Sequence, residues 1–121
     1  MTHEDQIRIC KLAAYAILRD GYITDAEMQL IDRLIAHFGM TPDERKEILA
    51  RNIDDDATIL AQEITSYTAR QEALVHLAEA VSVDGHVTRS ERSLLLKCAQ
   101  VMEISEETLR EITAHTIHWQ E

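Results

Sequence analysis

The sequence has few of the residues that sheets and nucleic-acid-binding surfaces require. Aromatic residues make up only 4% of the 121 residues, and there are one proline and three glycines. A composition so poor in these residues, and rich in Ala, Leu, Ile and Glu, favours helices over strands. Lysine and arginine number 12 against 22 aspartates and glutamates, which gives a net charge of −10. We therefore expect no nucleic-acid partner, because binding to a phosphate backbone needs a basic surface.

Other absences narrow the class of protein further. The two cysteines, Cys10 and Cys98, lie far apart at apolar helical positions and lack the spacing of a zinc or redox site. We expect them to be small buried side chains in a reducing compartment. The sequence has no signal-peptide pattern and no long apolar run, so it predicts a soluble, cytoplasmic protein without membrane insertion. It has no Gly-rich phosphate loop and no nucleophile elbow, so we predict no catalytic residue and no enzyme.

One short motif occurs twice. Residues 20–27 and 84–91 both read D-G-x-(I/V)-T-x-x-E, and they are 64 residues apart. Matching residues continue in register on both sides of the motif. A gapless repeat of this kind indicates two similar halves around a pseudo-twofold axis. We predict a single domain over residues 1–121, with repeat halves at about 4–50 and 69–118.

The apolar spacing predicts an all-α fold of about seven helices with short connections and no strand. Two almost continuously apolar segments, residues 4–19 and 69–83, are expected to form the most buried pair of helices, crossing near the pseudo-axis. Their alanines would permit a close approach of the two backbones.

The repeated motif has a complete structural explanation. Gly21 and Gly85 end the preceding helices, and we expect both to adopt positive φ. Thr24 and Thr88 each stand three residues before a glutamate, which predicts a capping box at the start of the next helix. In a capping box, the hydroxyl and the carboxylate each satisfy an exposed backbone N–H.

These helices and paired turns resemble the TerB-like family. That family includes tellurite-resistance proteins and the N-terminal domain of a membrane-anchored DnaJ-type co-chaperone. The resemblance covers nearly the whole chain and is carried by both copies of the motif, at 20–27 and 84–91. It implies an all-helical domain, a link to tellurite or general stress resistance, a proposed metal-binding role and no enzymatic activity. The co-chaperone's transmembrane segment and J domain are absent from this sequence, so its membrane role is not implied.

The acidic residues of the two turns are the candidate metal ligands. Asp20, Glu27, Asp84 and Glu91 would supply an all-oxygen site, which suits calcium, magnesium or manganese better than zinc. A carboxylate that caps a helix through one oxygen can still ligate a cation through the other. We therefore predict that the two turns share one divalent cation.

An ordinary EF-hand is not expected in either turn. The last eight positions of an EF-hand loop resemble the motif, with Gly at the sharp bend and Glu as the final ligand. The acidic residues that should precede them are replaced by Ala16 and Leu18 in the first copy, and by Ala80 and Ser82 in the second. Each loop alone has too few oxygen ligands for calcium.

Two other groups of side chains could hold a metal. Glu72, His76 and Glu79 share one face of a predicted helix, but the first repeat has no matching set, so we interpret them as a solvent-exposed face. His115 and His118 are spaced to share a face near the end of the chain, in a segment expected to fray.

Two classes of function remain. The first is a stress-related protein that binds a divalent cation through the paired turns. The second is an adaptor whose acidic surface or interhelical groove binds another protein, with turns that only cap helices. Convergence of the carboxylates of the two turns on one point would favour the first class.

Overall fold

The computed structural model describes residues 1–18, 23–50, 56–83, 85 and 87–119. Within these ranges the chain forms seven helices and no strand, which confirms the all-α prediction. The helices are α1 (His3–Leu18), α2 (Asp25–His37), α3 (Pro42–Leu49), α4 (Ala57–Glu63), α5 (Tyr67–Ser82), α6 (Arg89–Val101) and α7 (Glu106–Ile112).

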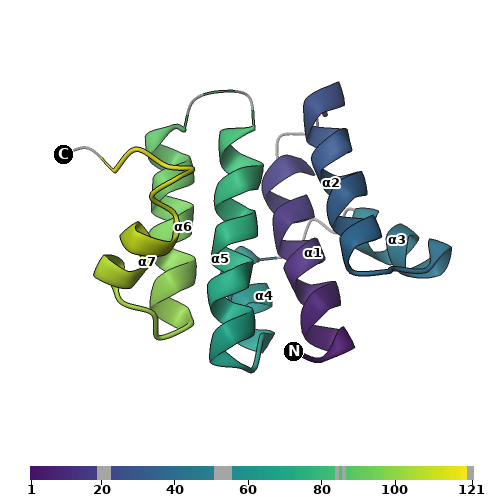
Figure 1. The fold of residues 1–121 in the computed structure, drawn as a ribbon, viewed down its shortest axis with the longest axis horizontal. Coiled ribbons are helices and arrows are strands. Elements are labelled where there is room, and N and C mark those ends of the chain that lie inside the picture. The colour runs from purple at the N-terminus through teal and green to yellow at the C-terminus, as the bar shows by residue number, and fades with distance from the viewer. Residues whose placement is uncertain (19–22, 51–55, 84, 86, 120–121) are drawn as a thin grey trace.

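The helices repeat along the chain with the spacing of the sequence motif. α1 and α5 are both 16 residues long, and α2 and α6 are both 13 residues long. Each helix of α5, α6 and α7 begins 64 residues after its counterpart in α1, α2 and α3. α4 has no counterpart and connects the two sets. In Figure 1, α1 and α5 run side by side in the same direction, with α2 outside α1 and α6 outside α5.

α1 and α5, the central pair, each contain more buried residues than any other helix of the described structure. This agrees with the prediction from the apolar segments. Ala13, Ala14, Ala78 and Ala80 are at most 3% exposed. Small side chains at these positions let the two helices pack closely, and this pair makes the most extensive contact between helices. α5 begins two residues before the predicted start, because the Ser66 hydroxyl caps it.

α2 and α6 end with the same hydrogen bonds. The Met40 N–H donates to Ile35 O and the Gly39 N–H to Ala36 O, which is a Schellman motif. The equivalent bonds, 64 residues later, join Ile104 to Ala99 and Glu103 to Gln100. Gly39 has φ +65° and Glu103 has φ +61°. The second repeat therefore places a glutamate in the left-handed conformation that glycine occupies in the first.

This difference predicts that substitutions at these two equivalent positions change the stability of the protein in opposite directions. Glu103→Gly should stabilise the protein by about 0.5–1 kcal/mol, because glycine adopts the left-handed conformation without the Cβ clash. Gly39→Ala should destabilise it by about 1 kcal/mol, through backbone strain alone, since a Cβ at Gly39 meets no atom within 4 Å. Urea denaturation of the two variants measures both changes, and a loss of stability in Glu103→Gly would contradict the argument.

A buried carboxylate connects α1 to the start of α5. Asp5 is fully buried, and its Oδ1 accepts a hydrogen bond from the Thr65 backbone N–H (3.2 Å) while its Oδ2 accepts one from the Thr65 hydroxyl (3.0 Å). Arg8 Nη1 lies 3.3 Å from the same carboxylate. Burial raises the pKa of Asp5, but the bonds from Thr65 and the charge of Arg8 outweigh burial and leave the pKa below its usual value.

The lowered pKa of Asp5 makes its contribution to stability depend on pH. The contribution is fully present above 3.8, the pKa of an ordinary aspartate, and is lost as the pH falls through the lower pKa of the folded protein. Asp5→Asn should therefore destabilise the protein by about 1–3 kcal/mol at pH 7, because one acceptor becomes a donor. The difference in the free energy of unfolding between this variant and the parent protein should become smaller in acid. Denaturation at pH 7 and at acid pH tests this, and an unchanged difference would contradict it.

Candidate functional site

Both glutamates of the repeated turns lie in capping boxes. Thr24 Oγ1 accepts a hydrogen bond from the Glu27 N–H (3.2 Å), and Glu27 Oε1 accepts one from the Thr24 N–H (2.9 Å). Thr88 and Glu91 repeat this pair of bonds at 3.1 and 2.9 Å. The predicted capping boxes are confirmed in both turns, and each fixes a glutamate in the first turn of α2 or α6.

Part of each turn lies outside the described residues. This holds for Asp20, Gly21 and Asp84, so the expected positive φ at Gly21 stays a prediction. Gly85 has φ +97°, which confirms the expectation for the second turn. A Cβ at Gly85 would meet no atom within 4 Å, so the requirement for glycine arises from the backbone conformation and not from crowding.

The helix ends that flank the two turns lie at one end of the molecule. α1 and α5 both finish at the end where α2 and α6 begin (Figure 1). In the same view α1 and α5 lie between α2 and α6, so Glu27 and Glu91 belong to the two outer helices.

The segment that follows α7 is held against the helices. Ile117 is 2% exposed, and the Trp119 indole N–H donates to Thr113 Oγ1 at 2.9 Å. The Arg110 guanidinium lies over the Trp119 ring, 5.6 Å from its centre. The prediction that this segment frays was therefore wrong. Its two tryptophan contacts and one buried isoleucine were not apparent from its position near the end of the sequence.

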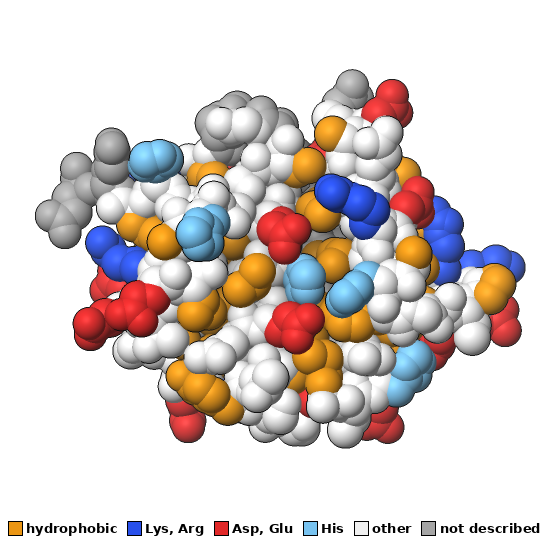
Figure 2. Space-filling model, in the orientation of Figure 1, with side chains coloured by type: hydrophobic (Ala, Val, Ile, Leu, Met, Phe, Trp, Pro, Cys, Tyr) orange, Lys and Arg blue, Asp and Glu red, His pale blue; other side chains and the backbone are white. Residues whose placement is uncertain are grey.

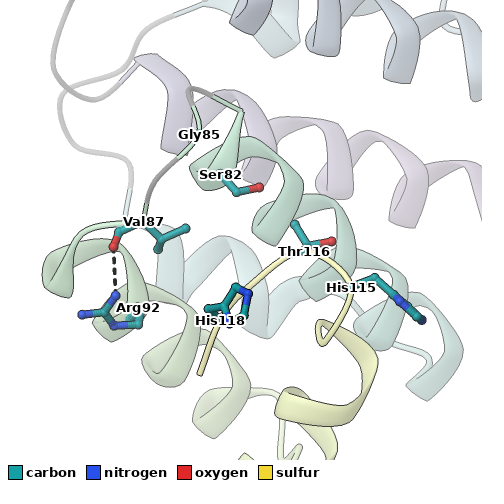
Figure 3. Close-up of a pocket in the computed structure, with 7 residues that line it drawn as sticks. All are labelled: Ser82, Gly85, Val87, Arg92, His115, Thr116 and His118. Carbon is teal, nitrogen blue, oxygen red and sulfur yellow. Dashed lines mark hydrogen bonds between the residues drawn. The ribbon is translucent and has the colours of Figure 1, made fainter. Parts of the chain in front are cut away.

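A pocket lies between this segment and the second turn. Its volume is about 620 Å³, and Figure 3 shows the side chains around it. Arg92 Nη1 donates to the Val87 carbonyl at 2.9 Å, which holds the arginine across the start of α6. Sequence reasoning did not identify Arg92. A comparison of the two repeats could have found it, because the first half has an uncharged residue, Met28, at the position equivalent to Arg92. The pocket is lined by Ser82, Gly85, Val87, Arg92, His115, Thr116 and His118.

A family model described as tellurite resistance protein TerB matches residues 6–114, nearly the whole chain. The chain belongs to the TerB family. The match includes both repeated turns and all seven helices except the first residues of α1. No curated protein and no solved structure shows significant similarity to the chain.

In this TerB-family chain, the environment of His76 differs from the solvent-exposed face expected from the sequence. Its side chain is only 15% exposed, and its ring packs edge-on against Phe38, with centroids 5.8 Å apart. Glu79 lies 3.2 Å from Nδ1 and Glu72 lies 3.5 Å from Nε2. The prediction of a solvent-exposed face was wrong for His76, because α2 brings Phe38 against this part of α5. Cys10 and Cys98 are buried as predicted, and burial raises the pKa of each thiol to about 12.

The described part of the chain contains no group of three or more His, Cys, Asp or Glu side chains placed to hold a metal ion. Asp20 and Asp84, two of the four candidate ligands, are outside that part, so the predicted shared site remains a prediction. Acidic side chains are spread over the face seen in Figure 2 and are not gathered at one point. None of the helices described has the length and apolar character needed to cross a bilayer.

The geometry of the second turn predicts two losses of stability. Gly85→Ala should cost about 1 kcal/mol through strain at positive φ. Thr88→Ala should also cost about 1 kcal/mol, because the Glu91 N–H loses its acceptor. Ser90→Ala is the matched control, since Ser90 is exposed in the same turn of α6, and it should change stability by less than about 0.5 kcal/mol. Equal denaturation midpoints for all three variants would contradict the capping-box account.

Proposed function

We propose that this protein is a non-enzymatic TerB-family domain that acts in tellurite or general stress resistance by binding a divalent cation. Asp20, Glu27, Asp84 and Glu91 would supply the carboxylate oxygens. Calcium, magnesium or manganese fits such an all-oxygen site.

The observation that carries this proposal is the common direction of α1 and α5. Because these helices pack side by side and run the same way, their ends at Leu18 and Ser82 lie at the same end of the molecule. Packed helix axes are roughly 8–10 Å apart. Asp20 and Asp84 follow two residues after these ends in the sequence. An antiparallel pair would have separated the two turns by the full length of a helix.

The capping role of the glutamates is compatible with binding. Glu27 and Glu91 each accept the cap hydrogen bond through Oε1. A carboxylate has about four lone-pair positions on two oxygens, so a carboxylate that caps a helix can in principle also ligate a cation. The cap also restricts the side chain, which lowers the entropy cost of binding an ion.

A second candidate is an adaptor that binds a basic protein surface. It is favoured by the capping boxes, which give Thr24, Glu27, Thr88 and Glu91 a structural role. It is also favoured by the placement of Glu27 and Glu91 on the two outer helices, with α1 and α5 between them (Figure 1). The net charge of −10 would draw a basic partner to the surface. In this case the turns serve only the fold.

Calorimetric titration of the protein with calcium, magnesium and manganese separates the two candidates. We expect the parent protein to bind at least one cation and the Glu27→Gln, Glu91→Gln double variant to lose that binding. Glutamine keeps a side-chain oxygen for the cap but removes the charge, so the double variant should remain folded. Added cation should also raise the melting temperature of the parent protein but not that of the double variant, because the ion binds only the folded state of the parent.

Glu44→Gln provides the matched control. Glu44 caps α3 through the same pair of bonds with Thr41, but it lies outside the two turns. This variant should bind cations as the parent does. Equal binding by the parent and the double variant would rule the two glutamates out as ligands. Absence of binding by every variant would favour the adaptor.

A further inference from the structure

The pocket between α5, α6 and the segment after α7 differs in charge from the rest of this acidic protein. Its described lining contains one arginine and two histidines, and no aspartate or glutamate. Overall, acidic residues outnumber lysine and arginine by 22 to 12. A basic pocket on such a chain attracts anions locally, although the protein as a whole repels them.

Arg92 provides the permanent positive charge of the pocket. Its one hydrogen bond among the described residues goes from Nη1 to the Val87 carbonyl, and no described carboxylate forms an ion pair with it. A guanidinium has five N–H donors in a fixed plane, so most of its donors remain for a ligand. In the first repeat, by contrast, Arg45 is paired with Asp32 at 2.8 Å.

Two further groups line the same pocket. In Figure 3, His118 is drawn between Arg92 and Thr116. The Arg92 guanidinium is turned toward the Val87 carbonyl, and the His115 ring points away from Arg92 (Figure 3). The His118 imidazole and the Thr116 hydroxyl can both donate to an oxygen atom. The Ser82 hydroxyl already donates to the Glu79 carbonyl at 3.3 Å, so it offers an acceptor and not a second donor.

We propose that this pocket binds a small oxyanion through Arg92, His118 and Thr116. Arginine binds the oxygens of phosphate-like groups through paired, charge-assisted hydrogen bonds. A metal ion is the weaker fit for the two histidines, because the fixed charge of Arg92 would repel it. The volume of about 620 Å³ leaves room for a free oxyanion or for the same group carried on a larger molecule.

The test is a titration of the full chain with inorganic phosphate and, separately, with tellurite, followed by amide and arginine side-chain NMR shifts. Sodium chloride at matched ionic strength is the reference. A chelator is present throughout, so that the result does not depend on cation binding at the turns. We expect saturable shifts at Arg92 and around residues 115–118 with at least one oxyanion. The relative affinities distinguish a phosphate site from a tellurite site.

Arg92→Gln should weaken oxyanion binding about tenfold or more, since hydrogen bonds to charged groups are worth this much. Arg89→Gln is the matched control, because it removes the same charge from an exposed position on the same helix, and it should change the affinity less than twofold. His118→Gln should weaken binding several-fold. Arg92→Lys keeps the charge and should retain part of the binding, so it serves if Arg92→Gln does not fold.

Three results would overturn the proposal. The first is an absence of saturable shifts beyond those produced by chloride. The second is equal weakening by Arg89→Gln and Arg92→Gln, which would indicate a general charge effect. The third is shifts that saturate but map to residues away from the pocket.

Discussion

The packing of α1 against α5 is the constraint on which the other features depend. Buried alanines on both helices allow a close approach, and the two helices run in the same direction. Each outer helix runs back along its central helix, so α1 and α5 end, and α2 and α6 begin, at one end of the molecule (Figure 1). Parallel neighbours cannot be joined by a short connection. α2 returns the chain along α1, and α3 and α4 then lead it to the start of α5 (Figure 1). Asp5 secures this return, because its buried carboxylate binds the Thr65 backbone between α4 and α5.

Much of the fold could be predicted from the sequence because its signals are local and occur twice. The capping boxes depend on residues three positions apart, and the left-handed turn at Gly85 depends on one glycine. The burial of the central helices follows from their unbroken apolar character. The repeat also indicated which helices correspond, since every helix of the second set begins 64 residues after its counterpart.

The features that escaped prediction depend on contacts between segments far apart in the sequence. His76 is shielded because Phe38 comes from another helix, and nothing around His76 in the sequence indicates this neighbour. The segment after α7 is ordered by Trp119 and Ile117, whose partners are set by the packing of α7. The pocket combines the end of α5, the start of α6 and this segment, so its basic character emerges only in three dimensions. For the candidate cation site, the sequence supplied all four carboxylates but not their mutual positions.

The two halves share their helices and capping boxes, but they differ in the side chains beside the turns. The first half has Met28 at the position of Arg92, so the arginine that lines the pocket beside the second turn has no equivalent in the first half. Gly85 lines the pocket and belongs to the second turn, so the oxyanion and cation proposals both involve this turn. A cation held by the turns, as proposed above, would favour an anion at Arg92 through its opposite charge. Thermodynamic linkage makes such an effect mutual, so an oxyanion would strengthen cation binding by the same factor.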